Sequence, residues 1–156
     1  MTKRTLIVTA SVSLLFAILV IGCATTGNAE KATVNFNGTW VNEKILPQKE
    51  VDTPDGWKQY NHASDTSPIY AGTSKLIRQW TDSEGNVWVK SLNTFTIPDE
   101  YKGQIFTGLT KYSKNGAVME STWQMPSSDE EMKNPVYPSK IDSQDPHYSI
   151  YYREEK

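Results

Sequence analysis

The apolar positions of the chain from residue 34 onward are occupied mainly by β-branched and aromatic residues. No stretch of a dozen residues there keeps the 3.6-residue hydrophobic period of an amphipathic helix. Short apolar segments are instead separated by clusters of glycine, proline, asparagine and aspartate, which is typical of strands joined by turns. The pattern therefore predicts an all-β domain with little helix.

The segment 73–125 is the most regular part of the chain. It divides into four strand-like stretches separated by turns that contain glycine. The strongest turn signal is Asn115-Gly116, because both central residues of a type I′ hairpin turn need a positive φ. Gly85 and Gly103 give similar conformational freedom to the other two turns. We expect a four-stranded antiparallel meander whose strands exceed the usual length of about five or six residues.

The remaining segments add two strands to this meander. A first strand is predicted at 38–45 and a last one at 147–155. The segments 46–71 and 126–146 each carry several prolines and are predicted to be irregular, although Ser128 can cap one helical turn in the second. Long strands in a meander twist strongly and curl over a core. We therefore predict a small antiparallel meander of about six or more strands that closes into a barrel or a strongly bent sheet.

The N-terminal segment has the three zones of an export signal. Lys3 and Arg4 precede an almost wholly apolar run at 6–21, and small residues surround Cys23. As a permanent transmembrane helix this run is slightly short, because crossing a bilayer takes about 20 apolar residues. A membrane-spanning segment is the weaker alternative to a cleaved signal peptide.

The last four residues of this segment, VIGC, end at Cys23 and resemble a bacterial lipobox. The resemblance implies that a diacylglycerol is attached to Cys23, that the chain is cleaved before it, and that the new amino terminus is acylated. The predicted organisation is a lipoprotein signal peptide at 1–22, the acylated cysteine and a flexible tether at 23–33, and a single β-rich domain at 34–156.

Cys23 is the only cysteine of the chain, which limits its other roles. A disulfide within the chain would need a second cysteine. A metal site would need companion ligands, and the two histidines, His62 and His147, are distant in sequence. A catalytic thiol would have no base beside it. Lipid attachment is therefore favoured, and the acyl chains would bind the membrane with about 0.8 kcal/mol for each buried CH₂ group.

The charge of the mature chain excludes two kinds of partner. The segment 1–22 holds two of the 16 basic residues and none of the 18 acidic ones, so cleavage leaves a formal charge of about −4. Such a domain has no electrostatic basis for binding nucleic acid, which favours basic patches, and it has no polybasic segment for anionic lipids. Ala24, rather than aspartate, follows Cys23, which resembles lipoproteins of enteric-type bacteria sent to the outer membrane. We expect an outer-membrane anchor facing the periplasm or the cell surface.

The residues FNGTW at 36–40 resemble the Phe-x-Gly-x-Trp first strand of the calycins, the lipocalin and fatty-acid-binding-protein group. The resemblance implies a ligand-binding barrel in which Trp40 plugs one end. It also implies that an arginine near the last strand packs across this tryptophan, and Arg153 is the matching position. A cation over an indole face stabilises by about 0.5–1 kcal/mol when exposed. A small β-barrel of another lineage is the alternative.

Residues for catalysis are sparse. The chain has no Gly-x-Ser-x-Gly, no His-Glu-x-x-His and no glycine-rich phosphate loop. His62 with Asp65, and His147 with Asp145, are the only pairs that could serve as acid and base, and local pairs of this kind arise often by chance. The acidic clusters in the predicted turns lack calcium-loop spacing. We predict neither an enzyme nor a metal or other cofactor.

Aromatic residues are the better candidates for binding. Trp57, Tyr60 and Tyr70 fall in the long segment 46–71, and long loops are uncommon unless they are functional or disordered. This segment is therefore the candidate binding loop. Three further aromatic side chains on predicted strands are candidates to line a cavity: Trp88, Phe106 and Trp123.

The sequence favours a membrane-anchored cell-envelope lipoprotein with a lipocalin-like barrel. The expected partner is a small apolar ligand, a glycan or an envelope protein. The alternative is a structural or assembly lipoprotein that docks onto a larger envelope complex without a small ligand. An enclosed apolar cavity lined by Trp88, Phe106 or Trp123 would favour ligand binding, whereas a filled core with exposed Trp57 and Tyr60 would favour docking.

Overall fold

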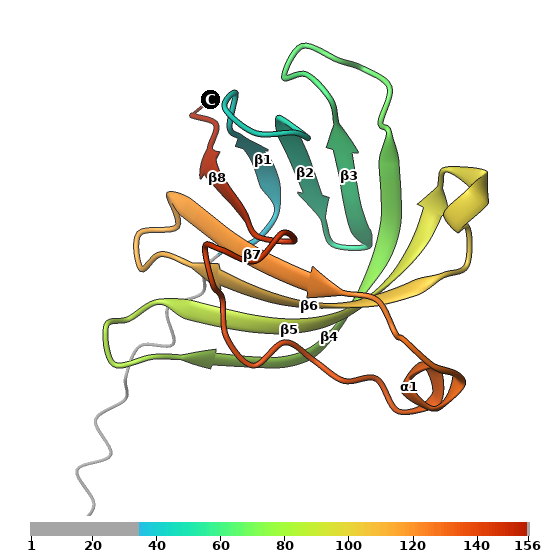
Figure 1. Ribbon diagram of the computed structural model, residues 1–156. Coiled ribbons are helices and arrows are strands. Elements are labelled where there is room, and N and C mark those ends of the chain that lie inside the picture. Colours follow the sequence, from blue (N-terminus) through green and yellow to red (C-terminus); the bar gives the residue numbers. More distant parts are fainter. Residues whose placement is uncertain (1–34, 156) are drawn as a thin grey trace, which may run out of the picture. The chain divides into compact units, whose positions relative to one another are not determined.

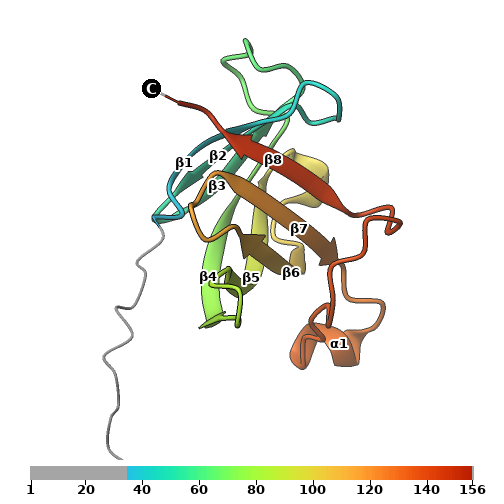
Figure 2. The same ribbon diagram turned by 90° about the vertical axis from the view of Figure 1, so that its left-hand side faces the viewer.

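The computed structural model describes residues 35–155, in which eight antiparallel strands form a closed barrel (Figure 1; Figure 2). Each strand pairs with the next along the chain, and the last pairs with the first. The all-β prediction, with a meander that closes into a barrel, is confirmed. The strands are β1 (Gly38–Val41), β2 (Lys49–Thr53), β3 (Gly56–Tyr60), β4 (Tyr70–Thr81), β5 (Val87–Ile97), β6 (Ile105–Tyr112), β7 (Val118–Gln124) and β8 (Ser149–Arg153).

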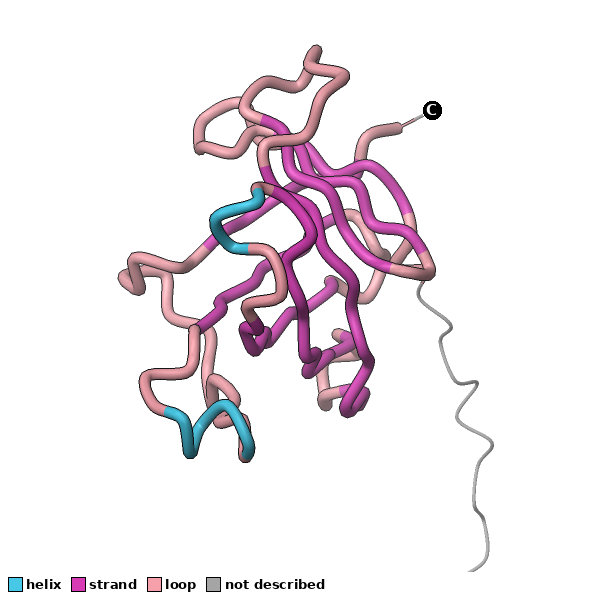
Figure 3. Tube along the Cα trace, turned by 90° about the vertical axis from the view of Figure 1, so that its right-hand side faces the viewer, coloured by secondary structure: helices cyan, strands magenta, loops and turns pink. Residues whose placement is uncertain are grey.

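Among residues 35–155, helical structure is confined to the connections between strands. A 3₁₀ turn, η1 (Asp99–Tyr101), lies between β5 and β6, and a short helix, α1 (Asp129–Lys133), lies between β7 and β8. Figure 3 shows both outside the ring of strands. The predicted helical turn is confirmed, because the Ser128 hydroxyl accepts a hydrogen bond from the Glu131 amide at 3.2 Å and caps α1.

The glycine turns of the meander form as predicted. Gly85, Gly103 and Gly116 have φ values of 90°, 83° and 69°, a region that costs glycine little. In the β6–β7 hairpin the Asn115 side-chain carbonyl accepts a hydrogen bond from the Ala117 amide at 3.1 Å. These turns fix the register of β4 to β7, which form the longest part of the wall.

The segment 46–71 is not an irregular loop. It contains the β2–β3 hairpin, so the barrel has eight strands where six could be predicted. Glu50 and Asp52 are alternate residues of β2, and both face the interior. Interior positions of a strand are usually apolar, so β2 shows the reverse of the usual pattern. Gly56 begins β3, and a Cβ there would overlap the carbonyl oxygen of Gly72 on β4. The glycine is needed for close strand packing and does not break the sheet.

One end of the barrel is filled by a cluster of buried side chains, Trp40, Tyr112, Met119 and Tyr151, which we call the plug. The Trp40 and Tyr112 ring centroids are 5.5 Å apart, and Trp40 is fully buried. The Arg153 guanidinium lies over the Trp40 ring at 4.5 Å, as the resemblance implied for this pair. Tight packing of large aromatic side chains closes this end to solvent.

The chain between β7 and β8 covers the outer face of the sheet. From α1 it passes along the outside of β5 and β6 before it enters β8 (Figure 1). Thr107 on β6 donates to the Val136 carbonyl at 2.7 Å, and Thr122 on β7 donates to Asp145 Oδ2 at 3.3 Å. Both threonines are buried, Thr107 on the outer face of β6, whereas Thr122 also borders the cavity. Hydrogen bonding satisfies the buried hydroxyls.

The chain divides between Thr33 and Val34 into two units, and the second contains every described strand and the plug. All barrel ladders close between Gly38 and Arg153, within this second unit. No helix among residues 35–155 has the length and apolar character needed to cross a membrane. Cys23, together with the predicted signal peptide and tether, lies outside the described residues.

Candidate functional site

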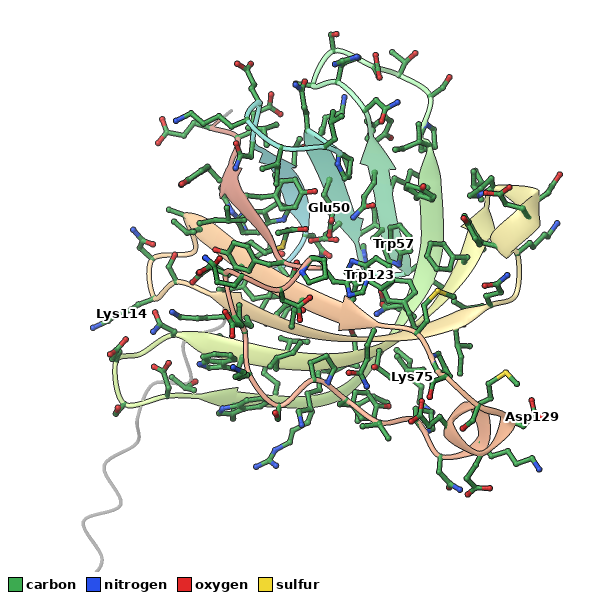
Figure 4. All side chains as sticks on the ribbon, in the orientation of Figure 1. Glu50, Trp57, Lys75, Lys114, Trp123 and Asp129 are labelled. Carbon is green, nitrogen blue, oxygen red and sulfur yellow. The ribbon has the colours of Figure 1, made fainter. Side chains whose placement is uncertain are left out.

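The barrel encloses a cavity of about 620 Å³ between its walls. This volume lies in the range of about 300–1,000 Å³ that is typical of small-molecule sites. Strand alternation builds its lining: on β5, for example, Val89, Ser91, Asn93 and Phe95 point inward while the residues between them point outward. In Figure 4 the side chains of Glu50, Trp57 and Trp123 also extend into the space inside the barrel.

Aromatic rings form one continuous part of the cavity wall, which we call the aromatic cluster. The Trp57 ring packs edge-to-face against Phe95 and against Phe106, and the ring centroids are 5.5 Å apart in each pair. Phe106 also packs against Trp123, with ring centroids 5.8 Å apart. Rings at these distances and tilts pack favourably and present apolar surface to the space between them. The cluster consists of Trp57, Tyr70, Phe95, Tyr101, Phe106 and Trp123.

Polar groups form a second part of the wall, on β2 and β3. Glu50 and Asp52 are alternate residues of β2 and both line the cavity. Glu50 pairs across the strands with Gln59, whose amide nitrogen donates to Glu50 Oε2 at 2.7 Å. Asp52 pairs with Trp57, the inward-facing tryptophan of β3. The two carboxyl groups therefore lie between the plug residue Trp40 on β1 and the aromatic cluster.

The enclosing walls change the protonation of this acid pair. Desolvation by burial raises the pKa of Glu50, although hydrogen bonds from Gln59 and Asp52 oppose the shift. Burial raises the pKa of Asp52 well above its usual range, and the neighbouring Glu50 charge raises it further. Trp40 and Arg153 only partly counter this. Like charges this close disfavour joint ionisation, so burial and proximity together favour retention of a proton by the pair, above all by Asp52.

Several polar atoms facing this region have no hydrogen-bond partner among the described residues. Asp52 Oδ2 and Trp57 Nε1 are both buried and unpaired, and they belong to directly opposite residues of the β2–β3 hairpin. Arg153 Nε and Trp40 Nε1 are likewise unpaired near the plug. Unpaired buried polar groups cost stability, so their concentration at one place in a wall marks that place for binding.

A third group of polar side chains lines the cavity from β4 and β5. The Ser74 hydroxyl donates to Asn93 Oδ1 at 2.6 Å, and the Asn93 amide donates to Ser91 Oγ at 3.0 Å. Gly108 on β6 leaves room for this chain, because a Cβ there would lie 3.0 Å from Ser91 Oγ. The chain is internally satisfied, so the open hydrogen-bonding capacity lies mainly at the acid pair.

Four of the six predicted binding residues line the cavity: Trp57, Tyr70, Phe106 and Trp123. Trp57 and Tyr70 do so from β3 and β4 and not from a loop, since the segment that carries them is folded into the sheet. The prediction of an aromatic binding loop is therefore wrong, although two of its three aromatic residues belong to the cavity.

Tyr60 and Trp88 do not line the cavity, which corrects their predicted role. Tyr60 lies on the outer face of β3, with Lys49 Nζ 4.3 Å from its ring centroid. Trp88 lies on the outer face of β5, stacks on Trp80 at 5.9 Å, and donates from Nε1 to Asp82 Oδ2 at 2.8 Å. Each is one position out of phase with the inward-facing residues of its strand.

The sequence prediction missed Glu50, Asp52, Gln59, Asn93 and Phe95 as cavity residues. The sequence does hold a signal for Glu50, Asp52 and Gln59. Glu50 and Asp52 are two positions apart, as are Trp57 and Gln59, so each pair falls on one face of a strand. It can be recognised only once the segment is known to be a hairpin, because polar residues at alternate positions otherwise indicate a solvent-facing surface.

The two histidine–aspartate pairs are local loop contacts. Asp65 Oδ2 accepts a hydrogen bond from the His62 backbone amide, and Asp145 Oδ1 accepts one from the His147 amide. Both histidines are exposed, although the His147 ring lies 4.3 Å from Trp123 beside the cavity. Within residues 35–155 no three acidic, histidine or cysteine side chains gather as a metal site.

The acid pair predicts an unusual pH dependence of stability. Because the pKa of Asp52 is raised, the folded state binds more protons than the unfolded state from about pH 4 upward. The free energy of unfolding is therefore expected to fall as the pH rises above about 4. The pKa of Asp82 is lowered to about 2, so its contribution to the free energy of unfolding is present above about pH 4 and is lost as the pH falls below that.

Urea denaturation at a series of pH values checks this expectation. In the wild type the midpoint should decrease as the pH rises above about 4, and in Asp52→Asn this decrease should be much smaller. A wild-type midpoint that rises over this range, or an unchanged slope in the variant, contradicts the assignment of the bound proton to the pair.

Comparisons of this chain with protein-family models, with curated proteins and with solved structures found no match. The function is therefore argued from the cavity and from the N-terminal sequence.

Proposed function

We propose that this chain is a membrane-anchored lipoprotein of the bacterial cell envelope whose barrel binds a small, largely apolar molecule. The observation that carries the proposal is the cavity of about 620 Å³ with the aromatic cluster in its wall. A barrel whose purpose is only structural fills its interior with side chains, as the plug does at one end. A cavity lined by aromatic side chains with a few polar groups is typical of ligand sites.

The location rests on the sequence. The charged start, the apolar run and the VIGC residues that end at Cys23 support export and lipid attachment. Ala24 supports an outer-membrane destination, facing the periplasm or the cell surface. The closed barrel with Arg153 over Trp40 supports a lipocalin-like architecture for the exported domain.

The exposure of the aromatic residues favours ligand binding over docking onto an envelope complex. Docking through the segment 46–71 required Trp57 and Tyr60 on the surface, and they are only 7% and 9% exposed. Large buried aromatic side chains are not available to a protein partner without local unfolding. A ligand in the cavity, in contrast, meets Trp57 directly.

Titration with the neutral fluorescent probe N-phenyl-naphthylamine tests the proposal on a chain that begins at Val34. We expect a saturable rise in probe fluorescence, because the aromatic cluster excludes water from the bound probe. Ser121→Trp, which fills the cavity from β7, should abolish most of the rise. Val118→Trp, on the outer face of the same strand, is the matched control and should leave it unchanged.

Absence of saturable binding by the wild type, or equal binding by Ser121→Trp and the wild type, would overturn the proposal. In that case docking onto a larger envelope complex becomes the favoured function. Thermal unfolding of each variant shows that a loss of binding is not a loss of the fold.

A further inference from the structure

The charged side chains that line the cavity have one sign. Glu50 and Asp52 are acidic, and no lysine or arginine of the described chain lines the cavity with them. His147 is the one basic side chain in the lining, and it is exposed beside Asp145. An apolar ligand with an anionic head would therefore have to place its charge beside two acids, which is unfavourable.

Arg153 does not neutralise the acid pair. Its guanidinium lies over the Trp40 ring and donates from Nη2 to the Asn35 carbonyl, while its Nε has no partner among the described residues. It lowers the pKa of Asp52 only as the last and weakest of five influences. When the two carboxyl groups are ionised, their negative charge is therefore only weakly compensated by a cationic side chain.

A second and independent observation places a polar ligand group at this part of the wall. Trp57 is more than nine-tenths buried and lines the cavity, yet its Nε1 has no partner among the described residues. Asp52 Oδ2, on the directly opposite residue, is also unpaired. Figure 4 shows Glu50 and Trp57 extending into the same interior space. A ligand donor placed here would pair with Asp52 Oδ2. Trp57 Nε1 is itself a donor, so it marks the site as polar and would pair with an acceptor, not with the cation.

The aromatic cluster adjoins the acid pair through Trp57. Ring faces attract cations, and Trp attracts them most strongly. The wall therefore combines carboxyl groups with a ring system that favours positive charge, and beyond these rings it offers apolar surface. An ammonium group on an apolar chain matches both parts at once.

We propose that the cavity selects an amphiphilic organic cation, whose ammonium group binds Glu50 and Asp52 while its apolar part packs against the aromatic cluster. This inference rests on the proposed ligand-binding function and names the ligand class. On binding, the proton that the acid pair shares leaves to the solvent, and the ligand's positive charge replaces it. No covalent bond is made or broken.

Competition against the neutral probe tests the inference with three ligands that share one alkyl chain. Octylamine is cationic, octanol neutral and octanoate anionic at pH 7. We expect octylamine to displace N-phenyl-naphthylamine at a concentration about tenfold or more below that of octanoate, with octanol between them. Calorimetry in buffers of different ionisation enthalpy should also register proton release with octylamine but not with octanol.

Removal of the acid pair should abolish this selectivity. In Glu50→Gln/Asp52→Asn, octylamine and octanol are expected to displace the probe at similar concentrations. The concentration of octanol that displaces the probe should be the same as in the wild type. The control Asp129→Asn/Glu130→Gln removes the same charge from α1, away from the cavity (Figure 4), and should keep the preference. If Glu50→Gln/Asp52→Asn fails to fold, Asp52→Asn alone replaces it, and its preference for octylamine over octanol should be smaller than that of the wild type.

The outcomes separate the two levels of the proposal. If the probe binds but the three ligands compete equally, or octanoate competes best, the cation selectivity is overturned while the ligand-binding function stands. If the double variant keeps the full preference for octylamine, the assignment to the acid pair is wrong. If neither probe nor ligand binds the wild type, the proposed function itself fails.

Discussion

Replacing Cys23 by serine is expected to release the protein from the membrane fraction almost completely. Attachment through acyl chains contributes about 0.8 kcal/mol for each buried CH₂, and a single chain binds only marginally, so several chains are needed for a stable anchor. The chain from residue 23 onward has a formal charge of about −4 and no polybasic segment that could substitute for them. Fractionation of bacteria that express the full chain measures the effect, and labelled palmitate should enter the wild type only.

The control for this experiment is Ala24→Ser, which introduces the same side chain one position later and leaves the cysteine in place. It should remain in the membrane fraction with its label. The size of the Cys23→Ser product must be checked, because a precursor with an uncleaved signal segment stays at the membrane for another reason. A soluble wild type, or a processed Cys23→Ser chain that still sediments with membranes, refutes the anchor.

The closed barrel was predictable because its longest strands are joined by turns with unambiguous chemistry. Asn115-Gly116 and the glycines of the neighbouring turns allow few alternatives, and their strands have the expected residue types. The β2–β3 hairpin was not predictable in the same way. Its inward positions include Glu50 and Asp52, and Gly56 has the appearance of a turn residue although it begins β3.

The candidate site was predictable in kind but only partly by residue. Aromatic residues are placed at a cavity as expected, but which of them face inward depends on the phase of each strand. A shift of one position moves a side chain to the other face, which is why Trp57 lines the cavity and Tyr60 does not. The acid pair could not be found from the sequence alone, because carboxylates at alternate positions also describe an exposed strand.

The interior therefore divides into two regions with opposite demands. The plug is aromatic and tightly packed, whereas the cavity next to it holds the acid pair and the unpaired Asp52 Oδ2 and Trp57 Nε1. Such groups destabilise the empty barrel, a cost that is common where a site must remain open for a ligand. The stability of the fold must then depend heavily on the plug, and above all on its largest side chain, Trp40.

Trp40→Ala is accordingly expected to lower the free energy of unfolding by about 3–5 kcal/mol, because it leaves a large void in a site that cannot collapse. Trp40 is fully buried, its ring contacts Tyr112, and it carries Arg153 on its face. The matched control is Trp80→Ala on the outer face of β4, whose loss should cost much less. Urea denaturation of both chains measures the difference, and Trp40→Phe, which keeps part of the ring volume, should fall between the wild type and Trp40→Ala. Equal losses for Trp40→Ala and Trp80→Ala would show that the closed end does not carry the stability of the barrel.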